Sequence, residues 1–216
     1  MNILAFTDIH GATEKVERIL KQESDFGAII LGGDLTTNGT VRQAQEAVVR
    51  FRRFGVPVFA VAGNMDHPET DIAFEEMGVS VNGRGMMLDH VGIFGVSASP
   101  FTPLHTPYEI SEEEIALRAH SGWKDIQSAP TTIFVPHAPP ANTRVDTLVS
   151  GNHVGSTAVR RFIELHQPTV VVCGHIHEAR GIDTLGNSTI VNCGPASRGY
   201  YALVKIGKEV LIEMKE

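Results

Sequence analysis

The stretch Ile3-Leu4-Ala5-Phe6-Thr7-Asp8-Ile9-His10 sets the pattern on which the fold is built. Four apolar residues in a row are typical of a strand buried on both faces, and the polar residues after them mark its end. The same arrangement, a short apolar run followed by a polar or glycine-rich turn, recurs along the chain. The further runs are Ala28–Leu31, Val58–Val61, Ile93–Val96, Thr132–Val135 and Val170–Cys173. We therefore expect a core of buried strands whose ends carry the chemistry.

Amphipathic segments lie between these runs and predict helices. Val16, Ile19 and Leu20 share one face of the first such segment. Three further helices are predicted from capping signals, which begin at Thr40, at Ser111 and at Ser156 or Thr157. Strands alternating with helices indicate βαβ units in the first two thirds of the chain.

The last third of the chain has a different pattern. Its predicted strands, Gly181–Thr184, Ser188–Asn192, Tyr200–Ile206 and Glu209–Met214, are joined by glycine-containing turns. Such a series predicts an antiparallel meander, so the whole chain should form a mixed sheet, or two sheets, with helices outside. No repeat, charge run or linker divides residues 1–216, which we predict to be a single domain. Two irregular stretches, Ser97–Ile110 and Ala138–Gly155, are candidate lids or binding loops.

Composition excludes several classes of function. The 216 residues include 18 Lys and Arg against 25 Asp and Glu, for a net charge of −7, so a long nucleic acid is not an expected partner. No apolar run approaches the ~18 residues of a membrane span, and the first residues do not resemble a signal peptide. With two cysteines, Cys173 and Cys193, a disulfide framework is not expected either. We predict a cytoplasmic protein without a membrane partner; its oligomeric state stays open.

Polar side chains follow five of the predicted strands. They are Asp8, His10, Asp34, Asn64, His137, His175 and His177. Carboxylate, amide and imidazole donors suit Mn, Fe, Zn or Co, and strand ends of one sheet meet at a common edge. Seven side chains are too many for one ion with open positions, but they suffice for two ions bridged by a carboxylate. Each motif alone is common in turns; together, in this order, they predict a dinuclear metal site.

The order Asp8-x-His10, Gly33-Asp34, Gly63-Asn64, His137 and Gly174-His175-x-His177 resembles the calcineurin-like metallophosphoesterase superfamily. The resemblance implies a four-layer αββα sandwich of two mixed sheets with two divalent metal ions at one edge. It implies two sites that share Asp34, the first completed by Asp8, His10 and His177 and the second by Asn64, His137 and His175. It also implies attack on phosphorus by a hydroxide that bridges the two metals. We expect Mn as the native metal, with Fe, Zn, Ni or Co as alternatives.

One position departs from the pattern of the family. Many members carry a histidine directly after the Asn as a proton donor, whereas this chain has Met65, which cannot transfer protons. Asp66 matches the acidic position that orients this histidine in the family. His67 and His153 are candidate replacements; we favour His153, whose segment Gly151–Ser156 resembles a loop found near the class III cyclic-nucleotide phosphodiesterase branch. If neither donates a proton, the rate should depend steeply on the leaving group.

We predict an enzyme that hydrolyses a small phosphodiester, with Asp34, Asn64, Asp66 and His153 as catalytic residues. Asn64, His153 and Arg198 are the predicted substrate contacts, since an arginine can hold a phosphate oxygen. A phosphomonoesterase acting on a small metabolite is the first alternative. A catalytically weak binding or scaffold module of the same fold is the second, although such a module has no need for a dense His/Asp set. The physiological substrate cannot be read from the motifs.

Overall fold

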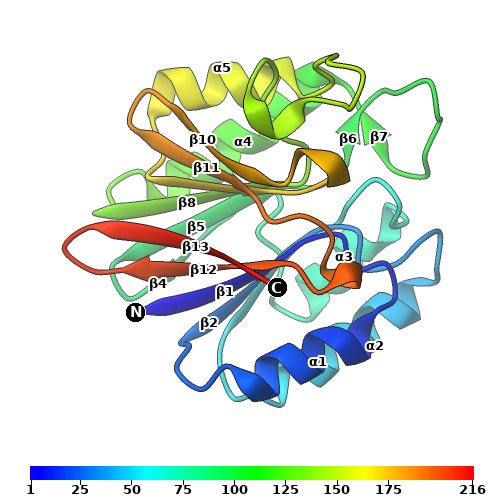
Figure 1. The fold of residues 1–216 in the computed structure, drawn as a ribbon, viewed down its shortest axis with the longest axis vertical. Coiled ribbons are helices and arrows are strands. Elements are labelled where there is room, and N and C mark those ends of the chain that lie inside the picture. Colours follow the sequence, from blue (N-terminus) through cyan, green and yellow to red (C-terminus); the bar gives the residue numbers. More distant parts are fainter.

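The computed structural model describes residues 1–216 and arranges them in four layers (Figure 1). Two sheets lie face to face in the middle of the molecule, and helices cover the outer face of each. The predicted αββα sandwich of two mixed sheets is therefore confirmed.

The first sheet has five strands in the order β13-β12-β1-β2-β3. Their bounds are β1 Asn2–Phe6, β2 Ala28–Gly32, β3 Val58–Val61, β12 Tyr201–Ile206 and β13 Val210–Lys215. Strands β1, β2 and β3 run parallel, and β12 is antiparallel to both β1 and β13. The three parallel strands thus end at the same edge.

The second sheet has six strands in the order β10-β11-β9-β8-β5-β4. Their bounds are β4 Gly85–Leu88, β5 Val91–Val96, β8 Thr131–Pro136, β9 Val170–Cys173, β10 Gly181–Leu185 and β11 Ser188–Asn192. The inner four strands are parallel, and the two edge strands are antiparallel to their neighbours. A separate short pair joins β6 (Ser99–Pro100) to β7 (Glu109–Ile110).

Three helices cover the first sheet and two cover the second. They are α1 (Thr13–Gln22), α2 (Val41–Arg52) and α3 (Glu69–Glu76) on one side, and α4 (Glu112–Ile126) and α5 (Thr157–His166) on the other. The predicted capping box of Thr40 and Gln43 is present, and Ser111 and Ser156 cap α4 and α5. Helix α3 was not predicted, because its buried face includes the polar Thr70 and Asp71. No helix combines the length and apolar content needed to cross a bilayer.

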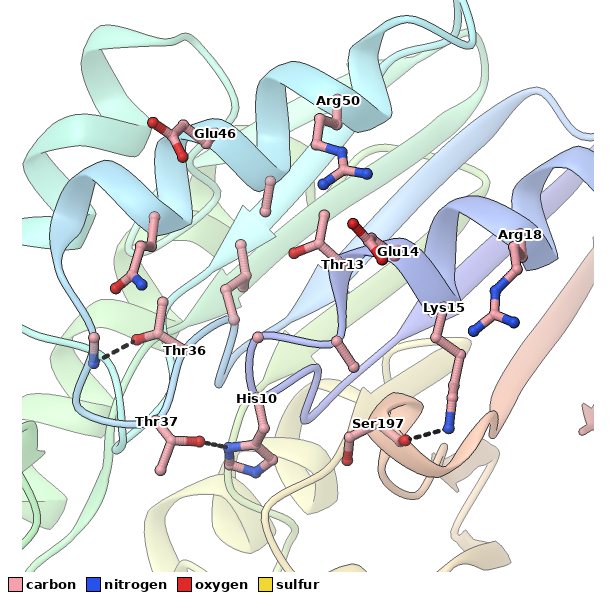
Figure 2. A pocket seen from close by; sticks show the side chains of 16 residues that line it. His10, Thr13, Glu14, Lys15, Arg18, Thr36, Thr37, Glu46, Arg50 and Ser197 are labelled. Atoms are coloured by element: carbon pink, nitrogen blue, oxygen red, sulfur yellow. Dashed lines mark hydrogen bonds between the residues drawn. The ribbon is translucent and has the colours of Figure 1, made fainter.

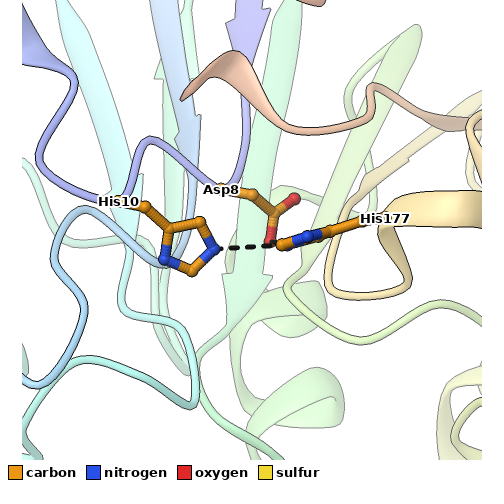
Figure 3. A group of neighbouring side chains, drawn as sticks. All are labelled: Asp8, His10 and His177. Carbon is orange, nitrogen blue, oxygen red and sulfur yellow. Dashed lines mark hydrogen bonds and ion pairs between the residues drawn. The ribbon is translucent and has the colours of Figure 1, made fainter. Parts of the chain in front are cut away.

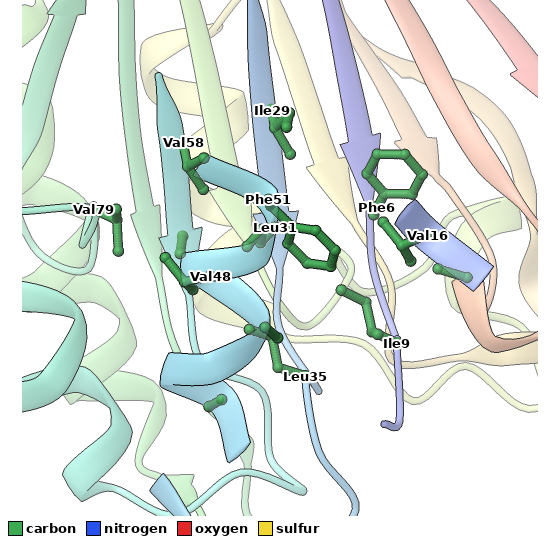
Figure 4. Packing of buried hydrophobic residues seen from close by; sticks show 14 of the residues in the cluster. Phe6, Ile9, Val16, Ile29, Leu31, Leu35, Val48, Phe51, Val58 and Val79 are labelled. Atoms are coloured by element: carbon green, nitrogen blue, oxygen red, sulfur yellow. The ribbon is translucent and has the colours of Figure 1, made fainter. Parts of the chain in front are cut away.

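Alternation along the strands explains the layering. In β1, Ile3 and Ala5 pack between the two sheets, while Leu4 and Phe6 pack beneath the helices. Figure 4 shows the latter side, where Phe6 and Phe51 fill the space between the first sheet and helices α1 and α2. Because successive side chains of a strand point to opposite faces, an apolar run such as β1 supplies both layers at once.

The predicted antiparallel meander was wrong in one respect. Strands β10 and β11 form a hairpin in the second sheet, but β12 and β13 form a hairpin in the first. Between them the chain crosses from one sheet to the other and passes the end of β1, where Ala196 N donates to Thr7 O. Local strand patterns cannot show this, because which sheet a strand joins depends on long-range pairing.

Candidate metal centre

The seven predicted ligands meet at the edge where the parallel strands of both sheets end. Asp8 and His10 follow β1, Asp34 follows β2, and Asn64 follows β3. The second sheet contributes the remaining three side chains, His137 after β8 and the pair His175 and His177 after β9. Both sheets therefore supply side chains to one group of contacts.

The first cluster consists of Asp8, His10 and His177, whose ligand atoms all lie within 4.8 Å of one another (Figure 3). His10 Nε2 is 3.2 Å from His177 Nε2, and His177 Nε2 is 3.4 Å from Asp8 Oδ1. Two imidazole nitrogens at this separation need a proton or a cation between them. A divalent ion about 2.0–2.1 Å from each nitrogen would fit, so this donor set suits a metal.

The second cluster is centred on the Asn64 amide oxygen. Asn64 Oδ1 is 2.9 Å from His137 Nε2 and 2.8 Å from His175 Nδ1. Asp34 joins the two clusters, because its Oδ1 lies 3.5 Å from His137 Nε2 and its Oδ2 lies 3.7 Å from His10 Nε2. One carboxylate therefore faces both groups of donors, the position that a bridging ligand requires.

Hydrogen bonds on the far side of two imidazoles fix their orientation. His137 Nδ1 donates to the Gly32 carbonyl over 2.8 Å, and His10 Nδ1 is 2.8 Å from Thr37 Oγ1. Each bond leaves Nε2 directed into the cluster, as in known metal sites where a second partner holds a ligating histidine. Thr37 was not predicted. A threonine close to Asp34 in the sequence is compatible with this role, but its position in the sequence alone does not identify it as the partner of His10.

Glycines leave room for the carboxylates and for one imidazole. A Cβ on Gly63 would lie 2.0 Å from Asp34 Oδ1, and one on Gly174 would lie 2.2 Å from Asp8 Oδ2. A Cβ on Gly33 would lie 2.4 Å from His137 Nδ1. These ligand side chains therefore pack directly against the glycine backbone, where a side chain would collide with them.

Four of the seven residues adopt a left-handed backbone. Their φ angles are +54° at Asp8, +47° at His10, +52° at Asp34 and +65° at His175. Such a conformation costs a residue with a Cβ of order 1–3 kcal/mol, and it tends to cluster at functional sites. Six other non-glycine residues, Asp89 among them, share this conformation, but at the site it falls on residues that turn a side chain toward the two clusters.

The pKa values reflect a buried group of opposite charges. Burial raises the pKa of Asp8, but the hydrogen bond from His177 and the nearby imidazoles outweigh it and bring it to about 2. Burial lowers the pKa of His137, yet Asp34 and Asp8 more than reverse this and raise it to about 9. Burial, with His137 beside it, lowers the pKa of His175 to about 4. A cation entering the site would have to displace the proton from His137.

Asp66 contacts backbone and a hydroxyl, and no metal-ligand side chain. Its carboxylate is fully buried and accepts hydrogen bonds from Leu35 N, Thr36 N, Thr36 Oγ1 and Gly63 N, at 2.8–3.1 Å. Burial, followed by the charge of Asp34, raises its pKa. Asp66 thus joins the turn that carries Asp34 to the turn that carries Asn64.

The structure places His153 and Arg198 outside the two clusters. His153 is exposed, and its Nδ1 donates to Asp146 Oδ1 over 2.6 Å. Its loop reaches the neighbourhood of His177, since Val149 N donates to Glu178 Oε1 over 3.3 Å. Arg198 is exposed in a separate hollow beside α1. Neither side chain contacts a predicted ligand.

Asp146 was missed by sequence reasoning. It is fully buried and also accepts from Asn142 N, Thr143 N and Gly155 N, so it organises the whole loop that carries His153. These partners are backbone atoms of a turn, which no residue pattern reveals.

Comparisons with known proteins show which family this chain resembles. A family model described as calcineurin-like phosphoesterase matches residues 1–179. The uncharacterized protein MJ1162 of Methanocaldococcus jannaschii is 31% identical over 205 residues, which cover 93% of this chain and 91% of that protein. The protein K07C11.7 of Caenorhabditis elegans is 24% identical over 219 residues, which cover 92% of this chain and 71% of that protein.

Solved structures share the fold. The protein TT1561 of Thermus thermophilus superposes with a TM-score of 0.78 at 20% identity, over 100% of this chain and 98% of that one. The purple acid phosphatase PPD1 of yellow lupin (Lupinus luteus) superposes with a TM-score of 0.63 at 12% identity, over 100% of this chain and 51% of that one. Together with the matching family model, these findings show that the chain belongs to the calcineurin-like phosphoesterases, a family of metal-dependent hydrolases that use a dinuclear centre.

Proposed function

We propose that this protein hydrolyses small phosphodiesters at two divalent metal ions. The observation that carries the proposal is the position of Asp34, whose two carboxylate oxygens face different donor clusters. Asp8, His10 and His177 would complete one site, and Asn64, His137 and His175 the other. We also propose that residues 1–216 act as one domain, because both sheets contribute ligands.

Bound at these sites, two divalent ions would acidify water and neutralise charge on the phosphate oxygens. The chain's own residues supply the geometry. Asp34 would hold the pair together, His10 and His137 are oriented by Thr37 and the Gly32 carbonyl, and Asp66 fixes the two turns that carry Asp34 and Asn64. We propose Mn as the native metal; Fe, Zn, Ni and Co accept the same donors.

The absence of basic side chains at the centre supports a diester rather than a monoester. No lysine or arginine forms a hydrogen bond or an ion pair with any of the seven ligands. A diester carries one negative charge, whereas a monoester at neutral pH carries nearly two and benefits from an added cation such as arginine. The same contacts leave Arg198 without an assigned role, so its contact with substrate stays a prediction.

His153 is our proposed proton donor to the leaving group. Asp146 holds its Nδ1, which leaves Nε2 without a partner in an exposed loop near His177. Paired with a carboxylate at Nδ1, the imidazole keeps a fixed orientation. His67, the other candidate, makes no side-chain hydrogen bond and has no comparable support.

The central experiment compares a diester with a monoester. Metal-stripped protein would be reconstituted with Mn²⁺ and assayed on bis-p-nitrophenyl phosphate and p-nitrophenyl phosphate. We expect turnover of the diester to exceed that of the monoester and to fall at least ~100-fold in Asp34→Asn. The matched control is Asp89→Asn, an exposed aspartate that also has a left-handed backbone.

Each alternative gives a distinct result in this experiment. Monoester turnover well above diester turnover would assign the protein to small phosphate monoesters. A folded protein that binds no metal and turns over neither compound would be a binding module of the same fold.

The role of His153 predicts a change in leaving-group dependence. A general acid contributes about 10²–10⁴-fold and matters most for poor leaving groups. Across aryl phosphodiesters of graded phenol pKa, His153→Gln should therefore steepen the dependence of kcat on phenol pKa, while His67→Gln leaves it unchanged. Equal slopes in wild type and His153→Gln, with chemistry rate-limiting, would remove His153 from the mechanism.

A further inference from the structure

A polar groove of about 660 Å³ adjoins His10, the one predicted metal ligand in its lining, and runs between helices α1 and α2 (Figure 2). His10, Thr37 and Ser197 lie at one end, and Glu46 and Arg50 of α2 lie farther along it. His10 belongs both to this lining and to the first donor cluster. A molecule whose phosphorus sits at the metals could therefore extend into the groove.

Several polar side chains of the groove lack partners within the protein. The Thr13 and Ser197 hydroxyls make no side-chain hydrogen bond, and Glu14 and Arg18, both exposed, form no ion pair. Other cations are already engaged: Lys15 Nζ donates to Ser197 O over 2.7 Å, and Arg50 is paired with Glu17. The groove thus offers a carboxylate, hydroxyls and a guanidinium, without a cluster of free cations that would suit a second phosphate.

The lining favours hydroxyl groups over a flat aromatic ligand. Its hydrophobic members are Ala12, Leu35 and Ala47, and no Phe, Tyr or Trp is among the lining residues. Nucleobases are held largely by stacking on aromatic side chains or arginine planes; the one imidazole of the groove, His10, belongs to the first donor cluster, and Arg50 is paired with Glu17. Hydroxyl groups, in contrast, can donate to Glu14 and accept from Thr13, Ser197 or Arg18.

We propose that this groove binds the retained alcohol of the diester, and that this alcohol is a polyol with neighbouring hydroxyl groups. The inference rests on the proposed diesterase function and specifies its substrate class. Glu14, as an anionic acceptor of hydroxyl donors, is the specificity-determining residue, because hydrogen bonds to a charged group are the strongest available in the groove.

Matched substrates isolate the contribution of the groove. Propyl p-nitrophenyl phosphate and 2,3-dihydroxypropyl p-nitrophenyl phosphate share their leaving group and differ only by two hydroxyls. With the Mn²⁺-loaded enzyme, kcat/KM for the dihydroxypropyl compound should be about 10-fold higher, mainly through KM. Thymidine 5′-p-nitrophenyl phosphate, which carries a base, should not exceed it.

Glu14→Gln should bring the ratio of the two kcat/KM values close to one. The matched control is Glu69→Gln, an exposed glutamate that likewise lies in the first turn of its helix, and it should keep the wild-type ratio. Because both substitutions remove one negative charge near a helix N-terminus, a general effect on helix stability would appear in both.

A binding measurement separates this inference from the proposed function. The groove is made by the chain itself, so metal-free protein should bind the dihydroxypropyl compound more tightly than the propyl compound in calorimetry, and Glu14→Gln should abolish the difference. Turnover of both compounds at equal kcat/KM, or a preference for the thymidine compound, would overturn the polyol site alone. If no diester is hydrolysed, the proposed function fails, while the calorimetric difference still decides whether the groove binds polyols.

Discussion

At the residue scale, the positions of the two ligand carboxylates, Asp8 and Asp34, depend on the glycines that face them. Gly63→Ala would place a Cβ 2.0 Å from Asp34 Oδ1, which is far inside van der Waals contact. Because Asp34 faces both clusters, its displacement should weaken both metal sites. We expect at least ~10-fold weaker metal binding by Gly63→Ala, measured as metal content after dialysis against graded chelator.

The control for this substitution is Gly181→Ala at the start of β10. There the added Cβ would meet only Ala179 O, at 3.9 Å, an ordinary contact. Unchanged metal content in both variants would show that Asp34 is not held by the close approach of Gly63.

Sequence and structure differ most in the residues that hold other predicted site residues in place. The candidate metal ligands could be predicted from the sequence, because polar residues placed directly after a buried apolar run must lie at the end of a strand. The roles of Thr37 and Asp146 could not be predicted from the sequence. Each contacts a histidine that comes near only when the chain folds. Asp66 was named from the sequence, but its bonds to Leu35 N, Thr36 N and Gly63 N became visible only in the structure.

At the element scale, Glu109 holds the loop that follows β6. Its carboxylate accepts from the backbone N–H and hydroxyl of both Thr102 and Thr106, at 2.7–3.1 Å. Burial raises the pKa of Glu109, but these bonds outweigh it and lower the pKa from 4.5 to about 2. A lowered pKa means that the stabilisation is present above pH 4.5 and is lost as pH falls toward 2.

The loop should therefore loosen as the pH falls from 4.5 toward 2. We expect the amide resonances of Thr102 and Thr106 to shift together between pH 4.5 and 2, and Glu109→Gln to remove this pH dependence. Glu69→Gln should leave both resonances as in wild type. Shifts that persist in Glu109→Gln would assign the transition to another group.

The strands and helices were predicted correctly where one hydrophobic pattern, that of a buried strand or that of an amphipathic helix, dominates the local sequence. The buried strands and the capped helices α2, α4 and α5 follow from local sequence. Helix α3 buries Asp71 within a network that includes Ser97 and Tyr108, so its buried side carries polar residues and gives no apolar stripe. The partners of β12 could not be predicted either, because they are distant in sequence.

At the scale of the whole molecule, the metal centre joins the two sheets. Asp8, His10, Asp34 and Asn64 come from the first sheet, and the other three ligands come from the second. Ions that bind only the folded chain stabilise it by mass action, by about 2.7 kcal/mol at a concentration 100 times Kd. For a chain of this size that corresponds to a rise of about 5–10 °C in Tm.

Chelation should therefore lower Tm by a similar amount, and Asp34→Asn should reduce or remove the response to metal. Differential scanning fluorimetry with and without Mn²⁺ measures both effects, and Asp89→Asn serves as the control. A Tm of the wild type that does not respond to any of the five candidate metals would contradict a metal centre that joins the sheets.

The left-handed backbone of Asp8, His10, Asp34 and His175 has a consequence for how such a protein changes over time. Glycine would relieve the backbone strain at each of these positions but would remove a metal-ligand side chain. At each residue, stability and activity therefore favour different amino acids. A descendant released from selection for hydrolysis would be expected to accumulate glycine there and to become harder to denature. An increase in stability caused by glycine at these four positions would then indicate a loss of activity.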